Sequence, residues 1–367
     1  MRSTPHQPFD PAADLLARHT AVAPGDTVVH MHGGASLDLV SALASAAGRV
    51  LVTHRSIVTV RALRRLVSES GIANVEAFAG QGTEPLPRDL SADVVSIRIP
   101  REALPLRQLL ANAFEVLRVG GRCFIAGAND EGAKSAARLL DELFGNSAVL
   151  ARKSGHRVVT AEKKAATPTN LVGFDSPYLD RDAFHACSVT LRGHAFTVYA
   201  RPGVFSWDHL DEATATLAGV MRVEVGERVL DLGCGAGVLG TLAALLSQTG
   251  RVVMVDADTE AVRSATCTAA AAGAGNVAVL ASDVADAVLD ERFDVVVTNP
   301  PFHTGKATDL DLPLRFIGDA WTALEPGGRL YLVANRTLPY ERAIRERFGA
   351  VSVAHDGPRF KVLSAIR

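Results

Sequence analysis

The sequence predicts an α/β protein built from two tandem Rossmann-like units, each with a mostly parallel twisted sheet and a closing antiparallel hairpin. Three observations support this fold class. Short apolar runs alternate with helical patterns, as in parallel sheets covered by helices. The same pattern returns after an offset of about 200 residues. Finally, 367 residues with 48% apolar content are enough for two hydrophobic cores.

The internal repeat is visible where glycine, proline and apolar positions recur in the same order. The matched segments are 24–36 with 225–237, 48–54 with 250–256, 93–100 with 294–301, 117–122 with 324–329, and 153–158 with 355–360. A repeat of this length indicates that one α/β unit occurs twice in the chain.

The first unit is expected to cover residues 1–164. Its strands are predicted at 27–30, 49–53, 75–78, 93–97 and 122–126, with a hairpin around 147–161. A helix is predicted over residues 56–68. The hairpin after the fifth strand adds an antiparallel strand to an otherwise parallel sheet.

Residues 165–185 contain Pro168, Gly173 and Pro177 and are predicted to form a linker. The second unit, residues 186–367, is expected to begin with a hairpin. Its elements are predicted at 188–191 and 196–199 for the hairpin, then 228–231, 251–255, 277–280, 294–298, 329–333 and 350–366 for the sheet.

A glycine-rich turn follows the first sheet strand of the second unit. Residues 229–240 read Val-Leu-Asp-Leu-Gly-Cys-Gly-Ala-Gly-Val-Leu-Gly. Glycines let the backbone approach a ligand closely at the carboxyl end of a strand, where open α/β sheets bind small molecules. The candidate cofactor-binding residues of the turn are Asp231, Gly233, Gly235 and Gly237.

Two kinds of cofactor fit this turn. The glycine spacing that ends at Gly240 is that of a dinucleotide fingerprint, and Asp256 stands at the distance of a ribose-binding acid. Asp231, Gly233 and Gly235 also form a D-x-G-x-G pattern that resembles the S-adenosylmethionine (AdoMet) loop of class I methyltransferases. The acid at Asp231 favours AdoMet, because dinucleotide folds do not require it.

In the AdoMet interpretation three carboxylates have separate roles. Asp231 is expected near the amino-acid end of the cofactor, and Asp256 is expected to accept hydrogen bonds from both ribose hydroxyls. Asp283, which follows the next apolar run, is placed near the adenine amine.

The segment Asn299-Pro300-Pro301-Phe302 directly follows the apolar run 293–298. A nucleobase amine is a poor nucleophile, because its lone pair is delocalised into the ring. The side-chain oxygen of Asn299 and the backbone carbonyl of Pro300 can both accept from such an NH2, and Phe302 can stack on the base. These three candidate catalytic residues imply transfer of a group to an amine nitrogen.

The first copy lacks the residue types that this chemistry needs. At the positions of Asp231, Gly233, Gly237, Asp256 and Asn299 it has His30, His32, Ser36, His54 and Arg98. We predict that it keeps the fold without a cofactor site. The three histidines have no carboxylate or cysteine at ligand spacing, so no metal site is predicted. Basic residues at 61, 64, 65, 152, 153, 157, 163 and 164 form either solvated faces or a surface that follows RNA phosphates.

Composition restricts the setting of the protein. Four isolated cysteines offer neither a disulfide framework nor a metal site, which favours a reducing compartment. No apolar run reaches the roughly 18 residues that a membrane span needs, and residues 1–8 do not resemble a signal peptide. We therefore expect a cytoplasmic protein. A net charge of -2 requires any RNA contact to be localised.

Several segments together resemble the RsmC-type ribosomal RNA guanine-N2 methyltransferases. They are Pro-Gly-Val-Phe-Ser at 202–206 with Leu210-Asp211, the D-x-G-x-G turn, Asn-Pro-Pro-Phe-His at 299–303, Val-Ala-Asn at 333–335 with Leu-Pro-Tyr at 338–340, and Arg-Phe-Lys-Val at 359–362. The resemblance implies two class I methyltransferase domains, the first degenerate, and AdoMet-dependent methylation of a guanine N2 amine, foremost in 16S rRNA. The implied partner is ribosomal RNA or a ribosomal subunit, which the first domain helps to hold, or else the first domain stabilises the second.

Four alternatives stay open at this point. They are guanine-N2 methylation of 23S rRNA, methylation of adenine N6 or of a protein glutamine, a dinucleotide-dependent oxidoreductase, and a non-enzymatic RNA-binding or assembly factor. The sequence does not specify which guanine is modified, whether the substrate is naked rRNA or a subunit, the role of His303, or the oligomeric state.

Overall fold

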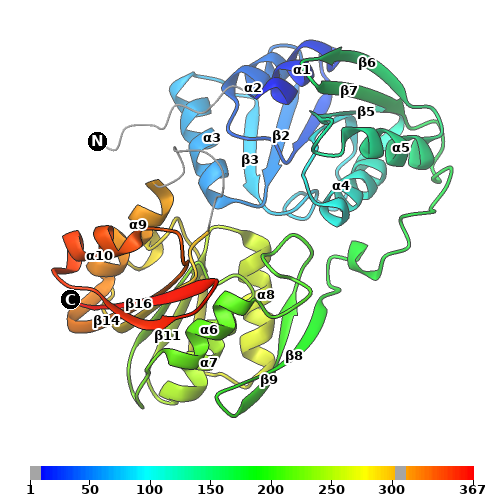
Figure 1. Ribbon diagram of the computed structural model, residues 1–367. Coiled ribbons are helices and arrows are strands. Elements are labelled where there is room, and N and C mark those ends of the chain that lie inside the picture. Colours follow the sequence, from blue (N-terminus) through cyan, green and yellow to red (C-terminus); the bar gives the residue numbers. More distant parts are fainter. Residues whose placement is uncertain (1–9, 302–310) are drawn as a thin grey trace. The chain divides into compact units, whose positions relative to one another are not determined.

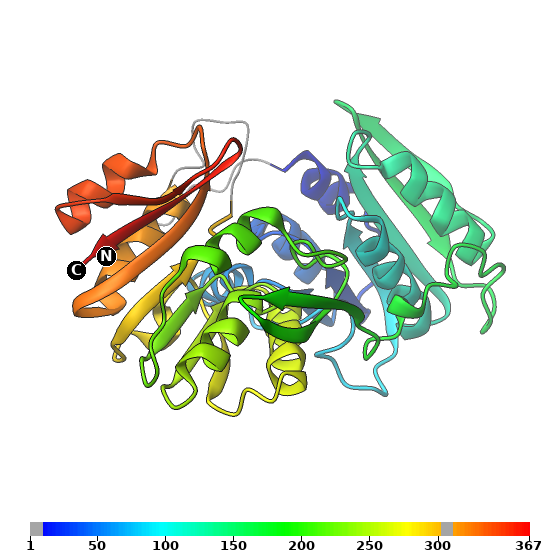
Figure 2. The ribbon, with the colours of Figure 1, turned by 60° about the horizontal axis from the view of Figure 1, so that its bottom comes forward.

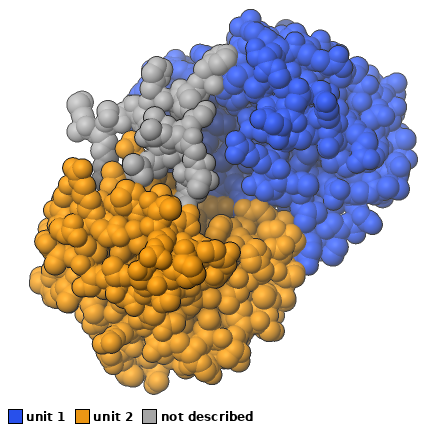
Figure 3. All heavy atoms as spheres, in the orientation of Figure 1, with its two compact units in different colours: residues 1–183 blue, residues 184–367 orange. Residues whose placement is uncertain are grey.

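The computed structural model describes residues 10–301 and 311–367. The chain divides into two compact units, Met1–Ala183 and Phe184–Arg367 (Figure 3). The division falls inside the predicted linker, residues 165–185. Each unit has its own sheet and core, and each is described by itself.

The first unit contains one sheet covered by helices (Figure 1). Its elements are α1 (Pro11–His19), β1 (Thr27–Met31), α2 (Leu37–Ala44), β2 (Arg49–His54), α3 (Ile57–Glu69), β3 (Val75–Ala79), β4 (Ala92–Arg98), α4 (Ala103–Val116), β5 (Leu117–Ala128), α5 (Ala133–Phe144), β6 (Ala148–Lys153) and β7 (His156–Glu162). The 7-stranded sheet has the order β3-β2-β1-β4-β5-β7-β6. Strands β1 to β5 pair in parallel, whereas β7 pairs antiparallel with both β5 and β6.

The second unit repeats this arrangement after a short connection. The connection contains η1 (Pro177–Leu179), which still belongs to the first unit. The elements of the second unit are β8 (His185–Leu191), β9 (His194–Ala200), α6 (Glu212–Val220), β10 (Val229–Leu232), α7 (Val238–Ser247), β11 (Val252–Asp256), α8 (Thr259–Ala271), β12 (Val277–Ala281), η2 (Asp286–Val288), β13 (Phe293–Thr298), α9 (Asp311–Ala323), β14 (Leu324–Asn335), α10 (Tyr340–Phe348), β15 (Ser352–Asp356) and β16 (Phe360–Ile366). The 7-stranded sheet order, β12-β11-β10-β13-β14-β16-β15, is the order of the first unit, and β8 and β9 form a separate hairpin.

Helices cover both faces of each sheet (Figures 1 and 2). In the first unit, α1, α2 and α3 pack on one face and α4 and α5 on the other, each face with its own apolar cluster. In the second unit, α6 and α7 share a cluster on one face, and α9 and α10 share a cluster on the other. The layered α/β fold predicted from the sequence is confirmed.

Matching polar contacts recur in both units. The carboxylate of Asp93 accepts a 2.8 Å hydrogen bond from the backbone N–H of Thr27, and Asp294 accepts one of 2.8 Å from Arg228. Each carboxylate connects the starts of two neighbouring central strands, β1 and β4 in the first unit and β10 and β13 in the second. These contacts support the register of each pair.

A cation after the last strand forms a second repeated contact. Lys163, which follows β7, donates to the carbonyl oxygens of Phe114 at 2.6 Å and Leu117 at 2.7 Å. Arg367, which follows β16, donates to the carbonyls of Thr322 and Leu324. In both units a basic side chain satisfies carbonyls where a helix passes directly into a strand.

Strands β5 and β14 are longer than the predicted strands 122–126 and 329–333, because each begins immediately after its preceding helix. The register of β14 on β13 shifts at this point. Gly327 has φ +84°, and a Cβ at Gly328 would lie 3.1 Å from the carbonyl oxygen of Asp294. The glycine pair therefore forms a bulge inside the strand rather than a turn before it.

Candidate active site

The carboxyl ends of β10 and β13 meet at the centre of the second sheet. Leu232 pairs with Thr298, and the hydroxyl of Thr298 donates to the carbonyl oxygen of Leu232 at 2.7 Å. Asn299 follows one residue after this pair, and the glycine turn follows Leu232. The two predicted centres therefore lie side by side at one sheet edge, as expected for a ligand site in an open α/β sheet.

The three predicted glycines of the turn all adopt left-handed backbone conformations. The φ angles of Gly233, Gly235 and Gly237 are +73°, +53° and +80°. A Cβ at Gly237 would lie 2.8 Å from the Cβ of Ala265, whereas a Cβ at Gly235 would have no atom within 4 Å. Gly237 thus allows the turn to pack on α8, and Gly235 faces open space beside the strand ends.

Asp231 is buried beneath the turn, with 1% of its surface exposed. Its Oδ2 accepts a hydrogen bond of 2.8 Å from the N–H of Gly240. Its Oδ1 has no hydrogen-bond partner within the described parts of the chain. The pKa of Asp231 is raised to about 7, mainly by burial and to a smaller extent by the negative charge of Asp256.

Asp256 ends β11 and holds the glycine turn in place. One carboxylate oxygen accepts from the N–H of Gly235 at 2.9 Å, and the other accepts from the N–H of Asp258 at 3.0 Å. Asp258 in turn caps α8 by accepting from the N–H of Glu260 at 2.9 Å. The proposed ribose acid is therefore fixed in position by backbone groups and lies against the turn.

Asp283 lies just beyond β12 at the same edge of the sheet. Its carboxylate pairs with the guanidinium of Arg315, on α9, at 3.0 Å. A contact from Asp283 to an adenine amine therefore stays a prediction, and any such contact would share the carboxylate with Arg315.

The residues at this edge fit AdoMet. The unpartnered buried oxygen of Asp231 can accept from an ammonium group, and the open space at Gly235 leaves room for close backbone approach. The carboxylate of Asp256 lies where a ribose would be held if the cofactor followed the turn.

The side chain of Asn299 is held by Asp211 and Thr214, for which no role was predicted from the sequence. Its Nδ2 donates to Oδ2 of Asp211 at 3.0 Å and to Oγ1 of Thr214 at 2.9 Å. Asp211 is the N-cap of α6, where it also accepts from the N–H of Thr214 at 2.8 Å. The signal that could have identified them is the Asp-x-x-Thr pattern of a helix start.

Pro300 and Pro301 follow Asn299 within the described chain. Phe302, the predicted stacking residue, and His303 lie outside the described residues.

In the first unit, the position of Asn299 is occupied by Arg98. Its guanidinium pairs with Asp10 at 3.1 Å and with Glu131 at 2.6 Å, and it donates to the carbonyl of Ile99 at 2.7 Å. These partners hold the cationic side chain within the protein. A guanidinium has no acceptor, so Arg98 cannot bind an amine as Asn299 can.

His30, His32 and His54, at the strand ends of the first unit, have lowered pKa values. His30, fully buried, approaches the carbonyl oxygen and the hydroxyl of Ser96 at 3.1 Å through Nδ1, and burial lowers its pKa to about 4. His32 stacks on His54 with ring centroids 5.1 Å apart. Burial lowers the pKa of His32 to about 3 and that of His54 to about 4. Within the described residues, no group of three or more possible ligands could hold a metal ion.

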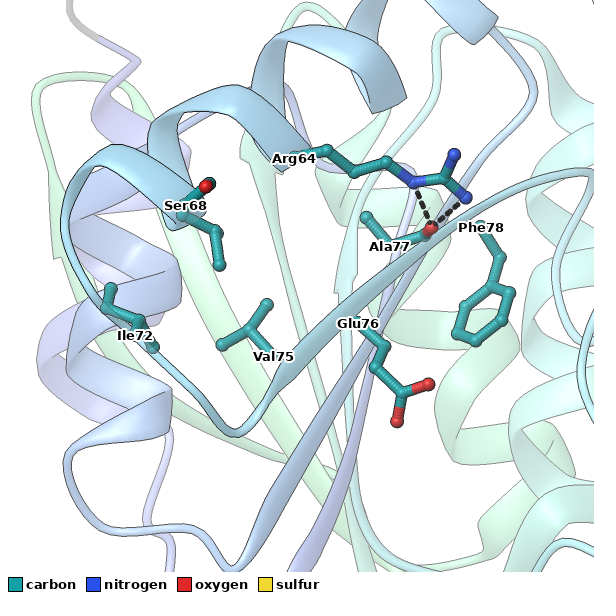
Figure 4. A pocket seen from close by; sticks show the side chains of 8 residues that line it. Arg64, Ser68, Ile72, Val75, Glu76, Ala77 and Phe78 are labelled. Carbon is teal, nitrogen blue, oxygen red and sulfur yellow. Dashed lines mark hydrogen bonds between the residues drawn. The ribbon is translucent and has the colours of Figure 1, made fainter.

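A cavity of about 400 Å³ lies elsewhere in the first unit, between α3 and β3 (Figure 4). The guanidinium of Arg64 donates to the carbonyl oxygen of Ala77 at 2.9 and 2.6 Å across this cavity. Since β3 is an edge strand, Arg64 covers an edge carbonyl that could otherwise pair with another strand. None of the predicted site residues lines this cavity.

The fold and the glycine turn define the class of protein, a Rossmann-like class I methyltransferase. Residues 195–364 match the family described as methyltransferase small domain. The chain is 33% identical over 362 residues to ribosomal RNA small subunit methyltransferase C of Klebsiella pneumoniae, covering 98% of this chain and 97% of the relative. The Escherichia coli protein of the same name is 32% identical over 361 residues, with the same coverage. The chain belongs to the ribosomal RNA small subunit methyltransferase C family.

A solved structure shows the same similarity over both units. It is the T. thermophilus 16S rRNA N2 G1207 methyltransferase (RsmC) in complex with AdoMet and guanosine. The match has a TM-score of 0.80 and 30% sequence identity, and covers 98% of this chain and 92% of the other. No helix in the described ranges is long and apolar enough to cross a membrane.

Proposed function

We propose that this protein transfers a methyl group from AdoMet to the exocyclic N2 amine of a guanine in 16S ribosomal RNA. The observation that carries the proposal is the orientation of Asn299 beside the glycine turn, with its Nδ2 held by the protein. Its side-chain oxygen is the group left to accept from a substrate amine. The T. thermophilus relative, described in complex with AdoMet and guanosine, supports the same pairing of cofactor and base.

Asp231, Gly233, Gly235, Gly237, Asp256 and Asp283 are the residues proposed to hold the cofactor. AdoMet, when bound, supplies an electrophilic methyl group. The buried Asp231 must be deprotonated to hold a cationic ammonium, and its raised pKa makes this dependent on pH near neutrality.

The proposed catalytic residues act on the amine. The side-chain oxygen of Asn299 and the backbone carbonyl of Pro300 each accept a hydrogen bond from the guanine NH2, which orients the nitrogen and stabilises the positive charge that develops on it. Phe302 is proposed to stack on the base. The methylated amine then releases its extra proton to water, so no strong base is needed.

The target guanine must be accessible to this site. A paired guanine hides its amine in the minor groove of an RNA helix, so it has to be unpaired or extruded before it reaches Asn299. The folding state of the RNA is therefore expected to control activity. The proposed substrate places the reaction with ribosomes in the cytoplasm.

We further propose that residues 186–367 form the catalytic domain and residues 1–164 a degenerate domain without a cofactor site. The ion pairs of Arg98 with Asp10 and Glu131 support the assignment of residues 1–164 as a degenerate domain. They hold a cation at the position where the second unit has Asn299.

The test is transfer of labelled methyl groups from AdoMet to naked rRNA, small subunits and large subunits from cells that lack the protein. We expect N2-methylguanosine in the 16S rRNA, lost with Asn299→Ala and kept with Asn170→Ala, an exposed control. Label in 23S rRNA, in N6-methyladenosine or in protein would redirect the assignment to that substrate. AdoMet binding without any transfer would favour a non-enzymatic role.

A further inference from the structure

We propose that Asp211 is a positioning residue of this reaction. Together with Thr214 it fixes the amide of Asn299 so that only the carbonyl oxygen faces the substrate amine. The inference rests on the proposed function, because it takes Asn299 as the amine acceptor. The three residues come together from the start of α6 and the end of β13, with Asp211 and Asn299 88 residues apart in the sequence.

The direction of each hydrogen bond follows from the chemistry of the three groups. A carboxylate only accepts, so Asn299 must turn its NH2 toward Oδ2 of Asp211, 3.0 Å away. The hydroxyl of Thr214 donates its one hydrogen to the same oxygen at 3.0 Å. Thr214 can therefore only accept from Asn299, at 2.9 Å. Both hydrogens of Asn299 Nδ2 are used within the protein.

This arrangement determines which substrates the site can accept. If the amide of Asn299 were rotated by half a turn, its oxygen would face the carboxylate of Asp211 and its NH2 would face the substrate. Acceptor would then oppose acceptor inside the protein, and donor would oppose donor at the substrate amine. Asp211 disfavours that orientation before the substrate arrives.

Asp211 can act in this way because it is itself anchored. It caps α6 through the N–H of Thr214 at 2.8 Å, and the buried side chains of Leu217 and Ala218 hold that helix on the sheet. A group fixed by packing loses little freedom when the substrate binds, which is the requirement for a preorganised site.

The first test compares substitutions that keep the shape of the site. Asp211→Asn retains an oxygen for capping, but its amide can also donate, so Asn299 can take either orientation. We expect kcat to fall about 10-fold, with KM for RNA and Kd for AdoMet changed less than about threefold. Thr214→Val should lower kcat in the same way, and Thr214→Ser, which keeps the hydroxyl, should retain the wild-type kcat.

The matched control is Asp208→Asn, which removes a carboxylate from the same loop. Asp208 is exposed and pairs with His209 rather than with Asn299. Its substitution should leave kcat unchanged. A wild-type kcat for Asp211→Asn, or an equal fall for Asp208→Asn, would overturn the proposal.

A second measurement needs no substrate. In protein labelled with ¹⁵N-asparagine, the side-chain NH2 signal of Asn299 is identified by its loss in Asn299→Ala. We expect slow hydrogen exchange in the wild type and at least about 10-fold faster exchange in Asp211→Asn and Thr214→Val, because one acceptor is weakened or lost. Unchanged exchange would refute the positioning role even if guanine methylation is found. Absence of guanine methylation by the wild type would instead refute the proposed function.

Discussion

Asp231 in the second unit and His30 in the first occupy equivalent positions, on the central strands β10 and β1 of their two sheets. His30 pairs with Val52 and Ser96, and Asp231 pairs with Met254 and Val297. Both side chains are buried, and each has one polar atom without a hydrogen-bond partner in the described structure. One is an acid with a raised pKa and the other a base with a lowered pKa, so the two units should respond to pH in opposite ways.

The first unit should become less stable as the pH falls from about 6.5 to about 4. The pKa values of His30, His32 and His54 lie at about 4, 3 and 4 in the folded state, against 6.5 in the unfolded chain. Their contribution is fully present above pH 6.5 and is lost as the pH falls through the folded values, because the unfolded chain then binds more protons. Each histidine contributes up to about 1.4 kcal/mol per pH unit.

Urea unfolding can separate this effect from the second unit. The two tryptophans, Trp207 and Trp321, both lie in the second unit, so their fluorescence follows that unit, whereas far-ultraviolet circular dichroism follows both. We expect the dichroism transition to move to lower urea at pH 5 without an equal shift in fluorescence. His54→Asn, which keeps an acceptor for the N–H of Ser56, should reduce the shift.

Asp231 should make the second unit less stable as the pH rises from about 4 to about 7. Its folded pKa of about 7 exceeds the unfolded value of 3.8, so its contribution is present at low pH and is lost through neutrality. AdoMet affinity should change in the opposite direction, rising to a plateau above pH 7, because the cofactor requires the carboxylate. Calorimetric titration with AdoMet from pH 5.5 to 8.5 would measure this, and a flat profile would contradict it.

Asp231→Asn is the companion variant. Its amide does not titrate, so tryptophan fluorescence should show a midpoint that depends less on pH. AdoMet affinity should be weak at every pH. An affinity that still rises with pH would show that another group controls cofactor binding.

Substitutions at Gly237 and Gly235 should affect different properties, the stability of the fold and the binding of AdoMet. Gly237→Ala places a Cβ 2.8 Å from Ala265 at φ +80°, and should lower the free energy of unfolding. We expect a loss of about 3 kcal/mol from strain and overpacking. Gly235→Ala meets no atom within 4 Å, so it should cost only the backbone strain and instead weaken AdoMet binding.

Thermal unfolding and AdoMet titration of both glycine variants distinguish the two effects. If Gly235→Ala bound AdoMet as tightly as the wild type, the open space at this glycine would not be part of the cofactor site.

Glu260 should be important for stability, because it lies in a buried ionic cluster. Arg201 pairs with it at 3.1 Å with both side chains almost fully buried, and Arg263 pairs with its other oxygen at 3.2 Å. Glu260→Gln removes the buried carboxylate charge that pairs with Arg201 and should lower the free energy of unfolding by about 3–5 kcal/mol. Tryptophan fluorescence in urea would measure the loss.

The exposed pair of Arg342 and Glu346 provides the control. Its nitrogen and oxygen lie 2.8 Å apart, yet both side chains are largely in water. Glu346→Gln should change the free energy of unfolding by less than about 1 kcal/mol. Equal effects of the two substitutions would mean that burial of Glu260 does not determine its contribution.

Much of the fold could be predicted because its signals are local. Glycine turns, apolar runs and the repeat itself identified both sheets, and Asn299 was recognised from the four residues of its own segment. The hydrogen bonds from Asn299 to Asp211 and Thr214 were not predicted, because these residues are distant in sequence and their local pattern indicates only a helix start. The pairing of Arg98 with Asp10 was missed for the same reason, since 88 residues separate them in sequence.

The cations Lys163 and Arg367 also bear on the ancestry of the chain. Each reaches back to the same helix–strand junction of its own unit, although one is an ammonium and the other a guanidinium. This shared contact supports the internal repeat seen in the sequence, whereas His30 and Arg98 stand at the positions of Asp231 and Asn299. The contact that closes each unit is therefore kept, although the residues at the predicted methyl-transfer site differ between the two units.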